Sequence, residues 1–291
     1  MTPLEAYSQR LEAYRQRDPD WRERELAARG RRIKDETAED DPRRLYINLL
    51  KRAVSGLTSP KLTSAVPAGR GEVELQEHED RQLREVGLDW PADAVTMIGL
   101  DRLEDIQQCV ETVIADGVPG DLIETGVWRG GATIFMRGLL KAYGVSDRRV
   151  FVADSFAGLP PGERYPADEG DRTHEVEFLA VPVEEVRANF ERFTLLDSQV
   201  EFVVGFFADS LPALRGHQWS VIRLDGDMYG STMEALTNLY PGLSPGGFAI
   251  IDDYGALASC KQAVDDYRAA HGIHEEIQWI DRTGVHWRRE S

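Results

Sequence analysis

The sequence predicts an α/β fold built around a mostly parallel sheet, and three observations support this prediction. Short apolar runs alternate with stretches of helical periodicity from about residue 103 to residue 270. Several of those runs end in acidic residues, as buried parallel strands do where they reach the ligand-binding edge of a sheet. Two later runs, residues 276–280 and 285–288, flank a turn-like stretch at 281–284 and predict an antiparallel hairpin.

The first forty or so residues differ in composition from the rest of the chain. Residues 1–42 are dense in Arg and Glu and predict a charged helical extension, with one apolar stripe formed by Leu4, Tyr7, Leu11 and Tyr14. The main domain is expected over residues 43–291, beginning with the apolar stretch 45–51. Residues 55–79 mix Gly, Pro, Ser and charge, which predicts a loop or a mobile arm.

Five strand–helix units make up the predicted sheet. The expected strands are residues 121–124, 149–154, 200–204, 220–224 and 248–251. The expected helices are residues 103–116, 132–143, 183–193, a helix opening at Ser231, and 260–270. The stretch from Ser231 to Glu234 has the pattern of a capping box. Five such units closed by an antiparallel pair form the layout of the seven-stranded Rossmann-like sheet common among methyltransferases.

Bulk composition excludes several classes of protein. A formal charge of −17 over 291 residues argues against a nucleic-acid partner, because phosphates favour Lys- and Arg-rich surfaces. The sequence has no apolar run long enough to cross a bilayer and no apparent signal-peptide core, so we expect a cytoplasmic protein without a membrane partner. Its two cysteines, Cys109 and Cys260, are too few for a disulfide framework and are not spaced for zinc.

Three aspartates follow two neighbouring strands of the predicted sheet. Asp225 directly follows the run 221–224, and Asp252 and Asp253 directly follow the run 248–251. The carboxyl ends of adjacent parallel strands meet, and like charges at close range raise one another's pKa values. A hard divalent cation with oxygen ligands removes that conflict, so Asp225, Asp252 and Asp253 predict a Mg²⁺-type site. The alternative is scattered loop aspartates that cap helices.

A glycine-bearing turn follows the first strand. Glycines at a strand-to-helix turn let a ligand approach the backbone and expose helix N-terminal amides. The candidate ligand contacts in this turn are Gly126, Val127, Trp128, Arg129 and Gly130. The dinucleotide pattern G-x-G-x-x-G is not met, which weighs against NAD. A plain tight turn remains an alternative interpretation.

Three strand ends suit the parts of one ligand. Glu124 favours a positive centre, such as a sulfonium or an ammonium group, and Asp154 with Ser155 suits a ribose diol. Phe207 with its aromatic neighbour, and Asp209, suit an adenine ring and its amine. A helix or turn cap is the alternative interpretation of Asp154. For Asp209 a cap, and for the phenylalanines a core position, is an equally good interpretation. Together the three strand ends predict S-adenosylmethionine.

These residues resemble the macrocin O-methyltransferase family, which methylates sugar hydroxyls on macrolides and other glycosylated natural products. The resemblance runs from about residue 43 to the C-terminus. Its matching stretches are 45–51, 96–99 with 102–103, 124–131, 154–160, 205–212, 224–232, 239–254 and 262–267. It implies a class I methyltransferase fold, S-adenosylmethionine and Mg²⁺ as cofactors, a small-molecule glycoside as substrate, and a homo-oligomer.

The resemblance also implies roles for single residues. It implies metal ligation by Asp225, Asp252 and Asp253, the arrangement shared with catechol-type methyltransferases. Those enzymes place a lysine base after the first metal aspartate, where this sequence has Met228, so Asp227 becomes the candidate base. A turn residue is the competing interpretation of Asp227. Met97 is a candidate for the donor pocket, with an ordinary core methionine as the alternative.

The polar segment 164–180 is too long for a plain connector and predicts a lid or substrate loop. Its Tyr165 and His174, with Tyr229 after the fourth strand, are candidate substrate contacts, although a solvent-exposed loop histidine is the favoured interpretation of His174. The expected function is transfer of a methyl group to a sugar hydroxyl. A catechol- or phenol-directed enzyme with the same metal site and a non-catalytic donor-binding scaffold remain alternatives, and an oxidoreductase is disfavoured.

Overall fold

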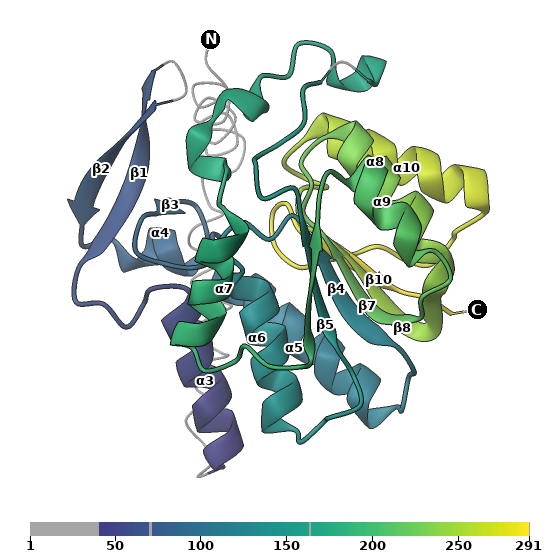
Figure 1. Ribbon diagram of the computed structural model, residues 1–291, viewed down its shortest axis with the longest axis horizontal. Helices are drawn as coiled ribbons and strands as arrows, with labels where there is room; N and C mark the ends of the chain where they lie inside the picture. The colour runs from purple at the N-terminus through teal and green to yellow at the C-terminus, as the bar shows by residue number, and fades with distance from the viewer. Residues whose placement is uncertain (1–40, 70–71, 163, 291) are drawn as a thin grey trace.

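A computed structural model describes residues 41–69, 72–162 and 164–290. The predicted N-terminal extension, with its stripe from Leu4 to Tyr14, falls almost wholly outside these residues. The described chain forms a seven-stranded sheet with helices on both faces, and a small three-stranded sheet beside it (Figure 1). The predicted α/β fold is therefore confirmed.

The large sheet has the strand order β6-β5-β4-β7-β8-β10-β9. Its strands are β4 (Asp121–Thr125), β5 (Val150–Asp154), β6 (Val200–Val204), β7 (Trp219–Leu224), β8 (Leu243–Ile251), β9 (Gln278–Trp279) and β10 (Val285–Arg288). Strands β4 to β8 are parallel, and β10 pairs antiparallel with both β8 and β9, as the predicted hairpin requires. From β4 the chain adds β5 and then β6 on one side, and it returns to place β7 and β8 on the other side of β4. This reversal of strand order creates a crevice at the carboxyl ends of β4 and β7.

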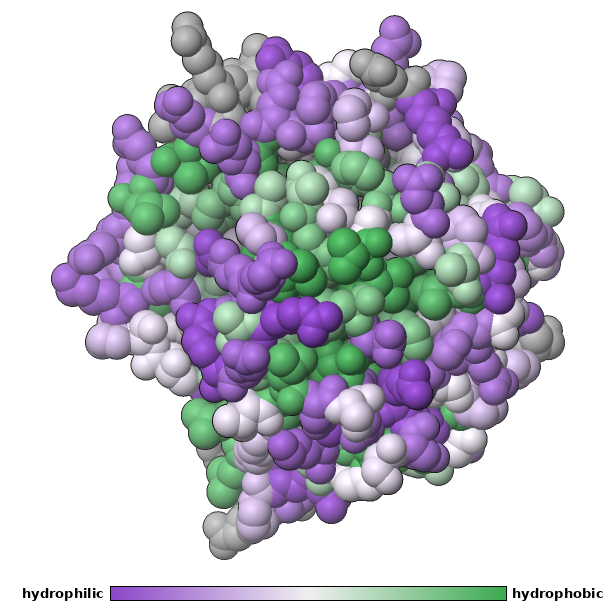
Figure 2. Space-filling view, viewed as in Figure 1, coloured by the Kyte–Doolittle hydropathy of each residue, from purple (hydrophilic) through white to green (hydrophobic). Residues whose placement is uncertain are grey.

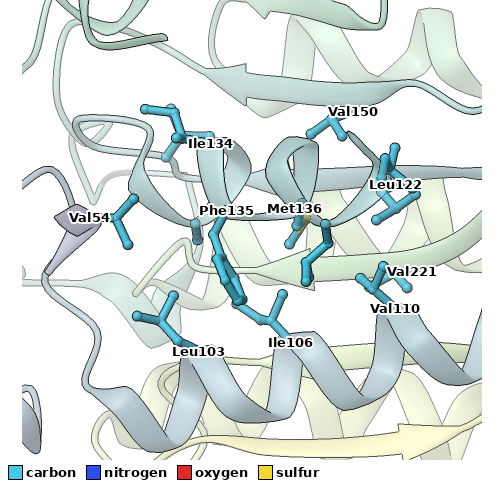
Figure 3. Packing of buried hydrophobic residues seen from close by; sticks show 14 of the residues in the cluster. Val54, Leu103, Ile106, Val110, Leu122, Ile134, Phe135, Met136, Val150 and Val221 are labelled. Atoms are coloured by element: carbon cyan, nitrogen blue, oxygen red, sulfur yellow. The ribbon is translucent and has the colours of Figure 1, made fainter. Parts of the chain in front are cut away.

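Two apolar layers enclose the sheet because successive strand residues face opposite sides. On one side lie α3 (Pro42–Val54), α5 (Leu100–Ala115), α6 (Gly131–Ala142) and α7 (Val183–Arg192). On the other lie α8 (Phe207–Ser210), α9 (Tyr229–Leu239) and α10 (Ala258–His271). In the first layer, Phe135 of α6 reaches toward Leu103 and Ile106 of α5, and all three side chains are fully buried (Figure 3).

The segment predicted as a loop or mobile arm contains an ordered hairpin. Strands β1 (Leu62–Gly69) and β2 (Glu72–His78) pair antiparallel, and β1 also pairs with β3 (Trp90–Pro91). Arg84, on α4 (Arg81–Glu85), is fully buried and bonds to both carboxylate oxygens of Asp89, which also accepts from Ser64 Oγ of β1 at 2.6 Å. The prediction of a loop was wrong because contacts between distant segments override a Gly- and Pro-rich local composition.

The start of α9 also differs from the sequence-based prediction. The helix begins at Tyr229, two residues before Ser231, and the described structure shows no capping hydrogen bond from its N-cap side chain, that of Met228. Asp168 supplies the cap from a distance: its two carboxylate oxygens accept from the backbone N–H groups of Tyr229 and Gly230, each at 2.8 Å. A long-range acceptor has replaced the local capping box.

Residues 155–162 and 164–182, here called the lid, connect β5 to α7. The lid contains three 3₁₀ turns: η1 (Pro166–Asp168), η2 (Thr173–Glu175) and η3 (Glu177–Leu179). Two further 3₁₀ turns, η4 (Leu211–Leu214) and η5 (Tyr240–Gly242), lie elsewhere. Apolar side chains gather across the middle of the face viewed in Figure 2. None of the helices in the described ranges is long and apolar enough to cross a membrane.

Gly126 fixes the junction between β4 and β7, and its substitution tests that packing. Its φ is +80°, and an added Cβ would overlap the carbonyl oxygen of Asp225. We expect Gly126→Ala to lower the free energy of unfolding by at least about 2 kcal/mol in urea denaturation. Gly117→Ala is the control: its φ is +63° with open space around it, so it carries backbone strain alone, about 1 kcal/mol. Equal losses in the two variants would contradict the packing argument.

Candidate functional site

A cavity with two lobes opens at the carboxyl ends of β4, β5, β7 and β8. The β5-side lobe is lined by Asp154, Ser155, Phe206 and Phe207 together with much of the lid. The β8-side lobe is lined by residues that include Trp90, Arg102, Glu124, Asp252 and Asp253. Both lobes share Met97, Trp128, Leu179, Asp225 and Asp227.

Three carboxylates converge where the lobes meet. Asp225, Asp227 and Asp253 each place an oxygen within 4.8 Å of the others. Burial, reinforced by the charge of Asp252, raises the pKa of Asp225 to about 6. Burial and the neighbouring Asp225 raise the pKa of Asp227 to about 7, and burial with Asp227 raises that of Asp253 well above its ordinary value. The cluster holds more negative charge than its surroundings offset.

The cluster suits a divalent cation. The Oδ2 atom of Asp253 is buried without a hydrogen-bond partner among the described residues. A cation bound by oxygens would satisfy that atom and relieve the repulsion that raises the three pKa values. Two of the three predicted ligands, Asp225 and Asp253, therefore lie where a divalent cation fits, together with Asp227.

Asp252, the remaining member of the predicted ligand set, lies beside this cluster in a different environment. Its Oδ1 accepts from Nη2 of Arg223 and its Oδ2 from Nη1 of Arg102. Arg102, on α5, also pairs with Asp281 at 2.9 Å. The structure thus brings Asp225 and Asp253 together with Asp227, and holds Asp252 between two guanidinium groups.

Glu124 is buried against Arg223 and faces the β8-side lobe. Its Oε1 accepts from Nη1 of Arg223, and its Oε2 is buried without a partner in the described structure. Burial raises the pKa of Glu124 to about 8, although Arg223 opposes that shift. Glu124, which the sequence predicts to attract a positive centre, is therefore paired with the guanidinium of Arg223 through Oε1, and its Oε2 has no partner in the described structure.

The glycine turn divides into residues that line the cavity and residues that support it. Gly126 and Trp128 line the β5-side lobe, and Val127 lines the β8-side lobe. Arg129 supports the turn: its Nη1 donates to the carbonyl groups of residues 91, 92 and 94 at 2.9–3.2 Å. Gly130 is the N-cap of α6, with φ +84°, and packs against Val186.

Asp154 joins the turn to the ligand cavity. Its Oδ2 accepts from the N–H of Val127 and its Oδ1 from the N–H of Phe156, both at 2.8 Å. Ser155 Oγ donates to the carbonyl of Gly158 at 2.5 Å. Asp154 therefore caps the turn, as one interpretation had it, and it also lines the β5-side lobe.

The remaining predicted contacts separate into two groups. Met97, Phe207 and Tyr165 line the β5-side lobe. Asp209 is exposed on α8, and His174 is exposed in the lid beside a separate shallow hollow. Tyr229 packs its ring on that of Tyr165 at 5.5 Å between centroids and bonds its hydroxyl to Asp266, so it supports the lid.

Sequence reasoning missed the two arginines and the long-range cap. The sequence did contain an indication for Arg223, because a charged residue inside the apolar run 221–224 needs buried partners of opposite charge. No local pattern indicated the roles of Arg102 and Asp168, because their partners, Asp252 and Tyr229, lie 150 and 61 residues away in the sequence. Backbone strain marks the same place: Trp128 (φ 48°) and Asp227 (φ 57°), both shared by the two lobes, are left-handed without being glycine.

Comparison with known proteins identifies relatives of this chain. The family model for Macrocin-O-methyltransferase (TylF) matches residues 48–289. The 8-demethyl-8-(2,3-dimethoxy-alpha-L-rhamnosyl)-tetracenomycin-C 4'-O-methyltransferase of Streptomyces olivaceus is 52% identical over 255 residues, covering 87% of this chain and 95% of the relative. The mycinamicin III 3''-O-methyltransferase of Micromonospora griseorubida is 48% identical over 252 residues, covering 85% and 97%.

A solved structure agrees with these relatives. The O-methyltransferase NovP superimposes with a TM-score of 0.77 at 47% identity, covering 86% of this chain and 100% of that chain. The fold and the resemblance predicted from the sequence are therefore confirmed.

Removing one charge from the carboxylate cluster tests its electrostatics. The pKa of Asp227 is raised to about 7, so the folded protein keeps a proton that the unfolded chain releases near pH 4. This group therefore lowers stability as pH rises from about 4 to about 7. Asp227→Asn should raise the Tm of the metal-free protein at pH 8 by about 2–4 °C, with a smaller gain at pH 5.

The control is Asp209→Asn, which removes an exposed aspartate of α8. Differential scanning calorimetry of both variants at pH 5 and pH 8 makes the comparison. A gain from Asp227→Asn that is no larger at pH 8 than at pH 5 would contradict the proposed repulsion.

Proposed function

This chain belongs to the macrocin O-methyltransferase family, whose members are S-adenosylmethionine-dependent, and from that premise we propose that it methylates a sugar hydroxyl of a glycosylated natural product in antibiotic biosynthesis. One observation carries the proposal. The two lobes of the cavity share the acidic residues Asp225 and Asp227, so a donor in one lobe and an acceptor in the other meet at carboxylates.

The β5-side lobe suits the methyl donor. Asp154 and Ser155 offer oxygens to ribose hydroxyls, and Phe206 and Phe207 offer aromatic surface to the adenine ring. Gly126 lines this lobe, and because it has no side chain the donor can approach its backbone. The sulfonium then lies toward Asp225 and Asp227, whose negative charge stabilises it.

The β8-side lobe suits a glycoside. It combines the aromatic residues Trp90 and Trp128 with the carboxylates Asp252 and Asp253. Apolar faces of sugar rings pack on aromatic side chains, and their hydroxyls bond to carboxylates. Val176 and Leu257 extend the apolar lining, which suits a bulky aglycone.

We assign the Mg²⁺ ligands to Asp225, Asp252 and Asp253. Asp252 and Asp253 line the β8-side lobe, and the arginine contacts of Asp252 leave one lone pair on each of its oxygens. Asp227 lines both lobes and is left to accept a proton, which a metal-bound carboxylate does poorly. When bound, the ion would lower the pKa of the acceptor hydroxyl and neutralise the cluster.

The chain's own residues then organise a single displacement. Asp227 accepts the proton of the acceptor hydroxyl while that oxygen forms a bond to the donor methyl carbon. The carbon–sulfur bond breaks in line, and the sulfonium leaves as a neutral thioether. The shared walls at Met97, Trp128 and Leu179 hold donor and acceptor in contact and exclude water.

Acceptor choice and the role of the base are tested in one assay. With S-adenosylmethionine and Mg²⁺, the protein should methylate glycosides and leave their aglycones and catechol unmodified. Asp227→Asn should lower kcat about 10²- to 10⁴-fold, because it removes the general base. Product is followed by mass spectrometry, and S-adenosylhomocysteine affinity serves as the control for an intact donor lobe. Preferential methylation of catechol would contradict the sugar assignment.

The metal assignment is tested by chelation and by direct binding. EDTA should reduce turnover at least about 100-fold, and added Mg²⁺ should restore it. In titration calorimetry, Asp252→Asn and Asp253→Asn should each weaken Mg²⁺ binding about 10- to 100-fold, and Asp227→Asn less than about threefold. If Asp227→Asn weakened Mg²⁺ binding more than Asp252→Asn, Asp227 would be a metal ligand in place of Asp252. Full activity in EDTA would contradict the proposed metal dependence.

A further inference from the structure

Asp168, a residue of the lid, accepts hydrogen bonds from the first backbone N–H groups of α9 and so connects the lid to that helix. We propose that Asp168 is a positioning residue: its carboxylate locks the lid over the donor lobe and fixes the turn that carries Asp225 and Asp227. The identity of the ligand in that lobe rests on the proposed function. The coupling between lid and turn rests on the contacts described next.

Asp168 is buried although the residues beside it are not. It is 4% exposed, whereas Ala167 and Glu169 on either side are exposed. Its Oδ1 accepts from the N–H of Tyr229 and its Oδ2 from the N–H of Gly230, each at 2.8 Å. The first amides of a helix have no partner within the helix, and they carry the positive end of its dipole. A carboxylate that takes two of them makes a strong attachment between the lid and α9.

The same amides border the residues that face the reaction. Tyr229 and Gly230 directly follow the turn 225–228, in which the N–H of Met228 donates to the carbonyl of Gly226 at 2.5 Å. Asp227 occupies the left-handed region in this turn. Because a left-handed aspartate persists only when its surroundings hold it, the position of α9 helps to set where Asp227 lies.

Gly230 provides a second attachment for the lid. A Cβ at this position would lie 2.5 Å from Cδ2 of Tyr165 and 3.2 Å from Oδ2 of Asp168, so the lid packs directly on the bare backbone. The ring of Tyr165 also packs on that of Tyr229. The ion pair between Arg164 and Glu234 is exposed at Arg164 and adds little.

The far end of the lid is attached independently. Phe178 stacks on Trp90, with ring centroids 5.5 Å apart and planes within 2°, and its carbonyl accepts from Nε1 of Trp128 at 3.0 Å. Loss of the Asp168 cap should therefore free the middle of the lid, which lines the donor lobe, and leave the Phe178 end in place. Donor binding and the geometry of Asp227 should change together.

Three variants separate this role from a general contribution to stability. Asp168→Ala removes both acceptors, and Asp168→Asn keeps one. Gly230→Ala keeps the cap residue and favours the helix, since Ala has the higher helix propensity, but its methyl displaces Tyr165. Glu169→Ala, at an exposed lid position, is the matched control.

Hydrogen exchange of the full-length, metal-free protein reads the attachment directly. In Asp168→Ala, peptides covering 164–175 and 225–231 should exchange about tenfold faster, while those covering β4 and β5 keep their wild-type rates. S-adenosylhomocysteine affinity should fall about tenfold in Asp168→Ala and in Gly230→Ala, remain within about threefold in Asp168→Asn, and be unchanged in Glu169→Ala. With an acceptor present, Asp168→Ala should lower kcat as well as raise the KM for the donor.

Either of two results overturns the proposal. Unchanged exchange in the lid and the turn would show that Asp168 does not hold them, and a uniform rise across the sheet would show only a structural cap. Failure of the sugar methylation assay would leave both exchange and S-adenosylhomocysteine results as they are. The two proposals therefore fail separately.

Discussion

The ion pairs of Arg223 hold the candidate site together. This guanidinium is 1% exposed at the end of β7 and bonds to Glu124 on β4, to Asp225 beyond its own strand, and to Asp252 beyond β8. It therefore joins the ends of three adjacent strands whose side chains would otherwise repel one another. Removing one partner of a buried ion pair leaves an uncompensated charge, which is strongly destabilising. The other features of the site are arranged around this charge.

The side chains that line the β8-side lobe carry more negative than positive charge. Five carboxylates, those of Glu124, Asp225, Asp227, Asp252 and Asp253, line this part of the cavity, and the guanidiniums that form ion pairs with members of this set in the described structure are Arg102 and Arg223. Fully ionised, the set and these two arginines would carry three negative charges. Asp281 also draws on Arg102, so the excess is no smaller than this. Burial and this excess of negative charge together raise the pKa values of Asp225, Asp227 and Glu124. A divalent ion and a sulfonium donor would bring three positive charges to the same place.

The sequence was sufficient for the features that depend on strand order. Apolar runs followed by Asp225 and by Asp252 and Asp253 predicted three carboxylates around one point at the edge of the sheet. Asp225 and Asp253 do converge there, with Asp227, whereas Asp252 lies between two guanidinium groups. Alternation of strand and helix predicted the large sheet. The predictions that were wrong concern features that depend on contacts between residues far apart in the sequence. These features are the hairpin of β1 and β2 and the start of α9, where Asp168 accepts hydrogen bonds from the first amides. Local composition carries no information about such contacts, because their partners are brought together only by the fold.

Asp227 shows how a local feature and a distant one combine. From the sequence it is an acid three residues past the expected strand 220–224, with a turn residue as the competing interpretation. Its left-handed backbone directs it into the cluster with Asp225 and Asp253. The turn holds that conformation because α9 begins immediately after it, and α9 begins there because a lid residue accepts its first amides. The reactivity proposed for one carboxylate thus depends on the hydrogen bonds of another, about sixty residues earlier in the chain.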